Sequence, residues 1–390
     1  MPDDHEGVLA RLLCESHQME PLALAGHATR AATAMGASGA DLFVTDLEQR
    51  VLVALAADGG AVGDPLPIDS TLAGRAFISG LPQIGGTEDD RQLWVPMVDG
   101  MDRLGVLRMD VTEVDNDFID RACALAGLLT LIIDNKKSHT DAYIRAARRR
   151  STTLAAEMQW GLLPPLTMVT PRVAVAGMLE PAYEIGGDSF DYALNGDRLD
   201  LAILDAMGHG LTAAWPAILA VSSVRHSRRR DLDLTEIYRE ADAVLKDQFP
   251  DPHFVTAQIA QLDVATGTLR WINAGHPPPL HLRHHSVVGS LGCDPSLPLG
   301  IGGVVEEEGE VMLQPGDRVL FFTDGVTEGR GPSGTPFGEA RLIDSLERAA
   351  LAELEPAETM RRLAHAVIDH HDHHLSDDFT LLLVQYRGPS

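Results

Sequence analysis

The chain has 390 residues, of which 45% are hydrophobic and 5% aromatic, and its formal net charge is −26. This length suits two or three domains, each with a hydrophobic core. The negative charge excludes a general binder of nucleic acid or anionic membranes, and the low aromatic content excludes a stacking surface for single-stranded nucleic acid.

Cysteine usage and the N-terminal segment indicate the compartment. The cysteines are odd in number and far apart, which argues against a disulfide framework or a thiolate zinc site. They are Cys14, Cys123 and Cys293. The first ten residues are acidic and lack the features of a signal peptide, and no apolar run approaches the roughly 18 residues that span a bilayer. We therefore expect a cytoplasmic protein without membrane insertion.

Residues 8–135 are predicted to form a small α+β domain. Apolar residues at helical spacing begin the segment, and short strand-forming runs follow between passages rich in Gly and Pro. The predicted strands are 41–44, 51–55, 93–97 and 105–109. Short strands between helices are typical of a sensor module.

Within this domain, the stretch from Ser70 to Pro82 leads a loop into a helix before a Gly-Leu-Pro turn. It resembles the corresponding segment of GAF domains, and the resemblance extends over 8–135. Two roles stay open for such a domain: binding of a small molecule, and dimerisation or protein sensing. No cysteine or histidine is placed to indicate a haem, tetrapyrrole or cyclic nucleotide.

Residues 116–160 contain no proline and a single glycine, Gly127, which predicts one long helix or two nearly continuous ones. We expect residues 136–163 to be a helical linker. Its a/d-spaced residues are Ile144, Ala147, Ser151, Leu154 and Met158. This stripe is either a packing face for a neighbouring domain or the seam of a dimeric coiled coil.

Residues 164–387 are predicted to form the second domain, which starts where Pro164 and Pro165 end the helical run. Expected strands are 173–178, 188–194, 199–204, 254–262, 269–273, 310–313, 319–323 and 379–385, and expected helices are 210–227, 234–248, 339–351 and 356–371. Sequential hairpins with helices inserted in pairs favour an α+β sandwich of antiparallel sheets flanked by helices over a doubly wound parallel sheet.

Aspartates stand at several predicted strand ends of this second domain. The motifs are Gly186-Gly187-Asp188, Asp205-Ala206-Met207-Gly208-His209-Gly210, Thr323-Asp324-Gly325 and Ser376-Asp377-Asp378. Asp205 and Asp324 follow apolar runs, whereas Asp377 and Asp378 precede one. In an antiparallel sheet these ends share one edge, so we expect the carboxylates to meet there.

Clustered carboxylates repel one another strongly unless a cation lies between them. Oxygen ligands of this kind suit Mg²⁺ or Mn²⁺, and two such ions activate water and orient a phosphoryl group for in-line attack. Any one of these aspartates is explained as well by a capping role at a strand or turn. Four such motifs in one domain favour a metal-dependent phosphoesterase.

Five motifs occur in the order found in SpoIIE/RsbU-like phosphatases, which are bacterial PPM-class enzymes related to protein phosphatase 2C. They are EIGGDSFD (184–191), DAMGHG (205–210), NAGHPPP (273–279), FTDGVTE (322–328) and DDFT (377–380). The resemblance covers about residues 160–387. It implies a PPM-type phosphatase domain that binds two Mn²⁺ or Mg²⁺ ions, and an upstream sensor domain also fits this family.

The resemblance also implies roles for single residues. Asp205 bridges the two ions and the carbonyl of Ala206 binds one of them, while Asp324 and Asp377 complete the more buried metal's shell. Asp188 acts on or near the metals. Asp191 ranks below Asp188, because three residues along a strand turn its side chain to the other face, and Asp378 ranks below Asp377.

Several basic residues have more than one interpretation. His209 is either the general acid for the leaving oxygen or a turn-fixing residue, and its offset of four from Asp205, where eukaryotic relatives have two, favours the latter. His276 is expected to be structural, and His370–His374 a solvated helix end. The run from Arg225 to Arg230 either complements a helix C-terminus or docks an acidic partner.

The expected function is dephosphorylation of phosphoserine or phosphothreonine in a protein. In the family that the chain resembles, the substrate is typically a phosphorylated anti-anti-sigma protein of the STAS fold. Such a partner is supplied in trans here, and the GAF-like domain is expected to control activity through the linker helix. A homodimer through the GAF-like domain and linker is a separate expectation. The alternatives are a non-catalytic phosphoprotein-binding scaffold and a phosphatase of small phosphoesters.

Overall fold

The computed structural model describes residues 4–56, 61–87, 90–180, 186–208, 210–249, 253–331, 334–372, 375 and 377–389. The chain divides into two compact units, Met1–Ser151 and Thr152–Ser390. Of the residues singled out above, Glu184, Ile185, His209, His373, His374 and Ser376 lie outside the described ranges. Within those ranges, no helix is both long and apolar enough to cross a membrane.

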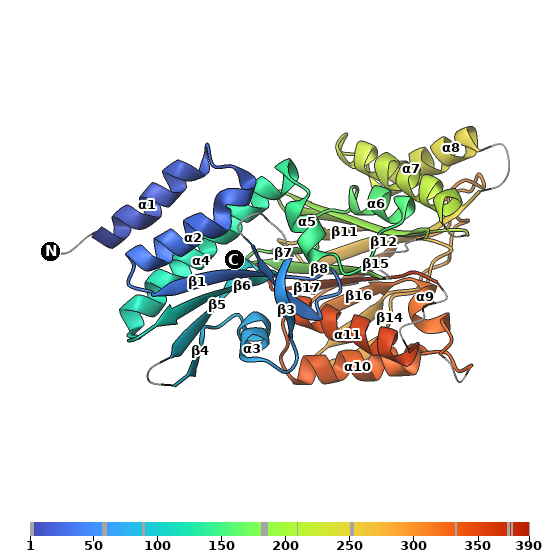
Figure 1. Cartoon of the computed structure of the whole chain (residues 1–390). Coiled ribbons are helices and arrows are strands. Elements are labelled where there is room, and N and C mark those ends of the chain that lie inside the picture. The colour runs from blue at the N-terminus through green and yellow to red at the C-terminus, as the bar shows by residue number, and fades with distance from the viewer. Residues whose placement is uncertain are drawn as a thin grey trace. The chain divides into compact units, whose positions relative to one another are not determined.

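The N-terminal unit is a six-stranded antiparallel sheet with helices on both faces (Figure 1). The strand order is β3-β2-β1-β6-β5-β4. The strands are β1 (Gly39–Thr45), β2 (Val51–Leu55), β3 (Ala61–Pro67), β4 (Gln83–Gly86), β5 (Arg91–Asp99) and β6 (Asp102–Val111). All four predicted strands lie within observed ones, whereas β3 and β4 were not predicted.

Alternation along these strands builds two cores. Leu42, Leu93 and Leu107 face a cluster made with α1 (Asp4–Ser16), α2 (Leu24–Ala34) and α4 (Asn116–Lys136). Phe43 and Trp94 face the opposite side, where they pack with α3 (Leu72–Ser79). Such period-two division between faces is what a strand covered on both sides requires.

The structure has neither the single long helix nor the two nearly continuous helices that were predicted over 116–160. The chain forms α4, a 3₁₀ turn (Lys137–His139), α5 (Ala142–Ala147) and α6 (Leu154–Trp160). Ser151, Thr152 and Thr153 lie outside the helices, and the Thr153 hydroxyl accepts a hydrogen bond from Ala156 N as the N-cap of α6. Serine and threonine favour such caps over helix interiors, so the a/d-spaced stripe is divided between two short helices.

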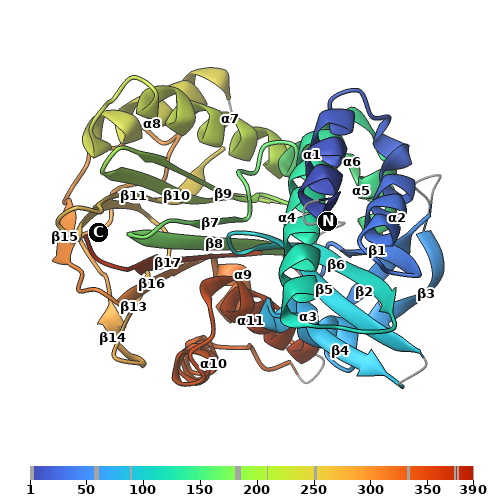
Figure 2. The ribbon, with the colours of Figure 1, turned by 90° about the vertical axis from the view of Figure 1, so that its left-hand side faces the viewer.

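The C-terminal unit is a sandwich of two antiparallel sheets with helices on both outer faces (Figures 1 and 2). One sheet has the order β15-β12-β11-β10-β9 and the other β14-β13-β16-β17-β8-β7. The strands are β7 (Thr167–Val169), β8 (Val173–Glu180), β9 (Asp188–Asn195), β10 (Arg198–Ala206), β11 (Val255–Asp263), β12 (Thr268–Ala274), β13 (Leu280–Arg283), β14 (Ser286–Ser290), β15 (Gly309–Met312), β16 (Arg318–Phe322) and β17 (Phe379–Tyr386).

The helices α7 (Leu211–Arg228) and α8 (Leu234–Gln248) cover the first sheet, and α10 (Glu339–Leu351) and α11 (Pro356–His370) cover the second. The two sheets bury a common core that includes Phe190, Ile203, Phe321 and Leu382. The predicted antiparallel α+β sandwich is confirmed. The short strands β7, β13 and β14 and the one-turn helix α9 (Asp324–Glu328) were not predicted.

Candidate active site between the two sheets

The predicted aspartates come together at one end of the sandwich. Asp188, the first residue of β9, pairs directly with Asp205 near the end of β10. In the other sheet, β16 ends just before Thr323 and Asp324, and its antiparallel neighbour β17 begins just after Asp378. Both pairs of strand ends therefore present carboxylates to the same space.

Strand periodicity explains why these side chains point inward. Along β9, Phe190 and Tyr192 face the core between the sheets, so Asp188 faces it too. Ile203 also faces this core, so Asp205, two residues further along β10, faces inward. Leu382 faces it too, so Asp378, four residues before it, faces inward. The carboxylates thus continue the inner faces of both sheets beyond the apolar core.

Asp188 is held by groups from both sheets. Its Oδ2 accepts a hydrogen bond of 2.6 Å from the Thr323 hydroxyl, and that hydroxyl accepts a bond of 2.9 Å from Thr380 N. Its carbonyl accepts a bond of 2.7 Å from Nε2 of Gln159, a buried residue of α6. Burial, then Asp378 and Asp205, raise the pKa of Asp188 well above its usual range.

Asp378 fixes the loop that carries Asp188. Its Oδ2 accepts hydrogen bonds from Gly186 N at 3.1 Å and Asp188 N at 2.8 Å, while Asp377 Oδ1 accepts one from Asp378 N. Burial raises the pKa of Asp378 to about 6. Asp378 therefore connects β17 to β9.

Glycines allow the backbones of this end to approach one another. A Cβ at Gly187 would lie 2.1 Å from the carbonyl oxygen of Ala206, and one at Gly325 would lie 2.0 Å from the carbonyl oxygen of Asp378. Neither contact is possible for a real side chain. Gly187 and Gly325 are therefore required by the close packing of the backbones.

The electrostatics of the cluster fit a hard cation. Burial comes first among the causes that raise the pKa of Asp205 to about 7, followed by the charges of Asp324, Asp378 and Asp377. Within the described part of the chain, none of these carboxylates forms an ion pair with Lys, Arg or His. Uncompensated carboxylates beside a backbone carbonyl are the donor set that Mg²⁺ and Mn²⁺ bind.

The carboxylates nevertheless lie further apart than the ligands of a bound metal ion do. Among the described residues, no three carboxylate, His or Cys side chains are close enough to enclose a metal. The chemistry of the donors fits the predicted ions, and closing on an ion requires the carboxylates to move toward one another.

Asp191 is not part of this cluster. It faces α7, where its Oδ1 accepts from Arg225 Nε at 2.8 Å and its Oδ2 from Arg228 at 2.5 Å. Arg225 also donates to the carbonyl of Leu162, just beyond α6. Two residues of the basic run at the end of α7 therefore have a structural task, which the sequence did not indicate.

The described histidines also have structural contacts. His276 is buried, its Nδ1 lies 2.8 Å from the Thr256 hydroxyl, and burial lowers its pKa to about 3. His371 Nδ1 lies 2.7 Å from the carbonyl of Val367, one turn back in α11. Gln159 and Thr323 were not predicted as site residues. The position of Thr323 next to Asp324 in a sequence motif could have indicated a role at the site, whereas no motif includes Gln159.

The C-terminal part of the chain is similar to known proteins. Residues 195–387 match the family described as Stage II sporulation protein E (SpoIIE). The phosphoserine phosphatase RsbP of Bacillus subtilis (strain 168) is 26% identical over 256 residues, which are 61% of this chain and 58% of RsbP. The phosphoserine phosphatase RsbU of the same strain is 22% identical over 237 residues, 60% of this chain and 69% of RsbU.

Among solved structures, the RsbU and RsbW domains of Rv1364c from Mycobacterium tuberculosis superpose with a TM-score of 0.48 at 28% identity. That match covers 58% of this chain and 63% of the other. The chain therefore spans about three fifths of the length of the first of these relatives and of this structure.

Proposed function

Residues 195–387 form a domain of the SpoIIE family, and from that premise we propose that the chain is a Mn²⁺- or Mg²⁺-dependent phosphatase of phosphoserine and phosphothreonine in proteins. The observation that carries the proposal is the cross-strand pair of Asp188 and Asp205, which face Asp324 and Asp378 of the other sheet with no ion pair to Lys, Arg or His among the described residues.

The proposed metal ligands are Asp205, the carbonyl of Ala206, Asp324 and Asp377. Two ions bound there would supply a water that is nucleophilic at neutral pH and would offset the charge of the phosphoryl oxygens. Thr323 and Asp378 position Asp188 through its carboxylate and its backbone N–H. Asp188 then contributes to the metal shell or orients water beside it.

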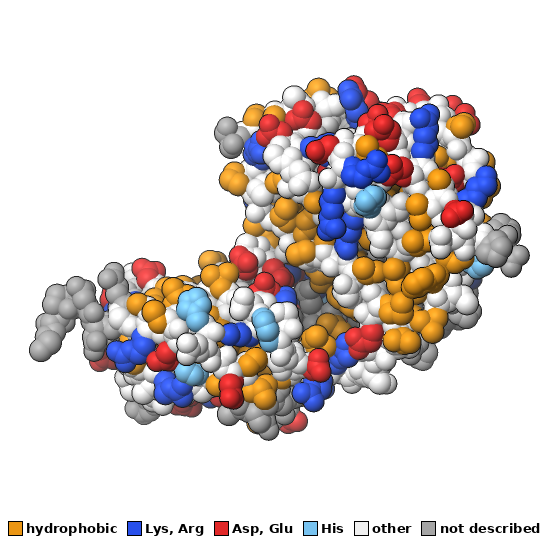
Figure 3. Space-filling view, turned by 90° about the horizontal axis from the view of Figure 1, so that it is seen from above, with side chains coloured by type: hydrophobic (Ala, Val, Ile, Leu, Met, Phe, Trp, Pro, Cys, Tyr) orange, Lys and Arg blue, Asp and Glu red, His pale blue; other side chains and the backbone are white. Residues whose placement is uncertain are grey.

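A protein substrate is supported by the surface next to the cluster. Met207, Leu211 and Trp215 are each about half exposed at the start of α7, immediately after Asp205 and Ala206. The molecular face that carries α7 and α8 shows apolar side chains grouped beside acidic and basic ones (Figure 3). Exposed apolar groups of this size are typical of protein contact sites, which a small phosphoester would not need.

We propose a phosphorylated STAS-domain protein as the substrate, acting in a cytoplasmic partner-switching pathway. The names of RsbP and RsbU call them phosphoserine phosphatases and thereby support the activity. The proposed input comes from the GAF-like domain of residues 8–135, through the linker of residues 136–163 and a homodimer. Two contacts at α6 support this proposal: Gln159 donates to the Asp188 carbonyl, and the Leu162 carbonyl accepts from Arg225.

The test is hydrolysis of p-nitrophenyl phosphate and then of a phosphorylated STAS protein, with Mn²⁺ and with EDTA. We expect turnover with Mn²⁺, and a loss of at least a hundredfold in Asp324→Ala. Asp344→Ala, which removes an exposed carboxylate of α10, is the matched control and should retain activity. Equal turnover in Asp324→Ala would refute the enzyme.

Two other outcomes identify the alternatives. Binding of the phosphorylated STAS protein without turnover would indicate a non-catalytic scaffold. A higher kcat/KM for small phosphoesters than for the phosphoprotein would indicate a small-molecule phosphatase.

A further inference from the structure

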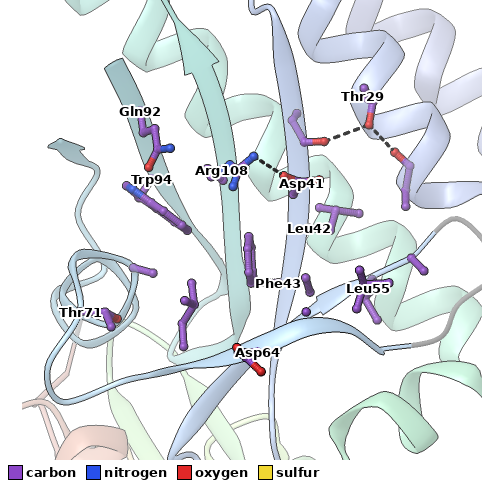
Figure 4. Close-up of a pocket in the computed structure, with 18 of the residues that line it drawn as sticks. Thr29, Asp41, Leu42, Phe43, Leu55, Asp64, Thr71, Gln92, Trp94 and Arg108 are labelled. Atoms are coloured by element: carbon purple, nitrogen blue, oxygen red, sulfur yellow. Dashed lines mark hydrogen bonds and ion pairs between the residues drawn. The ribbon is translucent and has the colours of Figure 1, made fainter. Parts of the chain in front are cut away.

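The N-terminal unit contains a cavity of about 700 Å³ that extends from the face of its sheet that α3 covers to α2 on the other face (Figure 4). This volume lies within the range of small-molecule sites. The lining comes from β1, β2, β3, β5 and β6, from the start of α3 and from α2. It lies within one compact unit and is separate from the aspartate cluster.

The base of the cavity is aromatic and aliphatic. The rings of Phe43 and Trp94 lie with centroids 5.5 Å apart, and Ala54, Leu72 and Ala73 add small apolar surface around them. Larger side chains at Ala54 and Ala73 would fill this space, so the small alanine side chains leave a cavity beside a well-packed core. Such a base suits the face of an aromatic ring.

Carboxylates dominate the charge of the rim. Asp41 and Asp64 line the cavity together with a single cation, Arg108. The guanidinium of Arg108 is already paired with Asp41 at 2.5 Å and with Asp110 at 3.3 Å. An anionic ligand would therefore meet excess negative charge, whereas a ligand with N–H donors or a positive charge would find acceptors.

A strand irregularity places one of these carboxylates at the cavity. Leu52 of β2 pairs with Leu66, but Ala54 pairs with Val62, so β3 carries two extra residues between these pairs. Asp64 lies in this bulge, and Figure 4 shows it at the edge of the cavity below Phe43. Bulges commonly re-aim a side chain at a functional site.

Gln92 completes the rim beside Trp94, two residues away on the same face of β5. Within the described ranges, neither its amide nor the Asp64 carboxylate has a hydrogen-bond partner in the protein. An amide and a carboxylate thus remain available above an aromatic base. Together they form a site with one apolar side and hydrogen-bonding groups at its edge.

We propose that this cavity binds an arylalkylamine that carries no negative charge. Its ring would lie against Phe43 and Trp94, and its N–H groups would point toward Asp64 and Gln92. The proposal does not depend on the phosphatase function. It makes the N-terminal unit a small-molecule receptor whose selectivity comes from the sign of charge at its rim.

The experiment compares tryptamine with indole-3-acetate, which share a ring but differ in charge. Isothermal titration of the full chain should show tryptamine binding with a Kd below about 1 mM, and indole-3-acetate binding at least about tenfold more weakly. Tryptamine should also raise the Tm. Absence of tryptamine binding, or equal or tighter binding of indole-3-acetate, would overturn the proposal.

Variants locate the site. Asp64→Asn and Gln92→Ala should each weaken tryptamine binding roughly five- to tenfold, which corresponds to about 1–1.4 kcal/mol. Asp99→Asn, at an exposed end of β5 away from the cavity, is the control and should bind as the wild type does. Ala54→Leu should fill the cavity and abolish binding. Wild-type affinity in both Asp64→Asn and Gln92→Ala would contradict the assigned site.

Discussion

The hydroxyl of Thr323 donates a hydrogen bond of 2.6 Å to the carboxylate of Asp188 and thereby connects the two sheets at the acidic cluster. Thr323 follows β16 in one sheet, and Asp188 begins β9 in the other. The position of one proposed metal-site carboxylate therefore depends on the register of a strand in the opposite sheet.

Thr323→Val removes this hydrogen bond while preserving side-chain shape. We expect a roughly ten- to hundredfold loss of Mn²⁺ affinity or of kcat/KM, the usual cost of deleting a group that orients a metal ligand. Titration of Mn²⁺ against activity measures it. Thr268→Val, in the hairpin at the other end of β11 and β12, is the control. Equal losses in the two variants would show a general effect on folding.

Gln159→Ala removes the contact between α6 and the carbonyl of Asp188. We expect roughly tenfold lower activity at limiting Mn²⁺, recovered in part at saturating Mn²⁺, because the variant loosens the loop and leaves every proposed ligand in place. Gln248→Ala, at the exposed end of α8, should behave as wild type. Unchanged Mn²⁺ dependence in Gln159→Ala would show that α6 does not influence the site.

Asp191→Asn tests whether this residue is structural. The variant leaves Arg228 buried and Arg225 half-buried without their countercharge, so the free energy of unfolding should fall by about 3–5 kcal/mol. Asp197→Asn breaks an exposed ion pair with Arg172 and should cost less than about 1 kcal/mol. Urea unfolding compares the two. A large loss of Mn²⁺ affinity in folded Asp191→Asn would instead make Asp191 part of the metal site.

The metal-free protein should lose stability as pH rises. The pKa of Asp205 is raised from 3.8 to about 7 in the folded state, so between these values the folded chain binds more protons than the unfolded chain. The contribution of Asp205 to stability is complete below pH 4 and is lost as pH rises through 7. Scans of Tm from pH 5 to 8 in EDTA should show this decline.

Mn²⁺ should oppose this trend, because it binds the deprotonated carboxylates and competes with protons. The Tm gained from Mn²⁺ should therefore increase with pH over the same interval. The same EDTA decline in Asp205→Asn as in the wild type would show that another group causes it.

Much of the sandwich could be predicted because its central strands are mainly apolar. The runs ending at Asp205 and Asp324 gave both the strands and the shared edge, and strand periodicity alone ranks Asp188 above Asp191. Strand periodicity along β17 also turns the Asp378 side chain inward. The preference for Asp377 did not include the hydrogen bonds that Asp378 accepts from Gly186 N and Asp188 N.

Other elements could not be predicted because tertiary contacts stabilise them. The hairpin of β13 and β14 turns at His284 and His285, and both residues have positive φ. Histidine in a sequence does not predict this conformation. The exposed β14 also lacks a hydrophobic pattern. Gln159 contacts Asp188 from a separate short helix, and no local pattern indicates a pair so far apart in sequence.

The pairing of β17 has a consequence for the order in which the protein matures. β17 lies between β8 and β16, with Phe379 opposite Glu180 and Phe322 opposite Leu381, and it brings Asp377 and Asp378 to the cluster. While the ribosome is still adding residues before 377, β8 has no partner on that side and the acidic cluster is incomplete. Completion of the acidic cluster and closure of the second sheet must therefore occur together, once β17 has been synthesised.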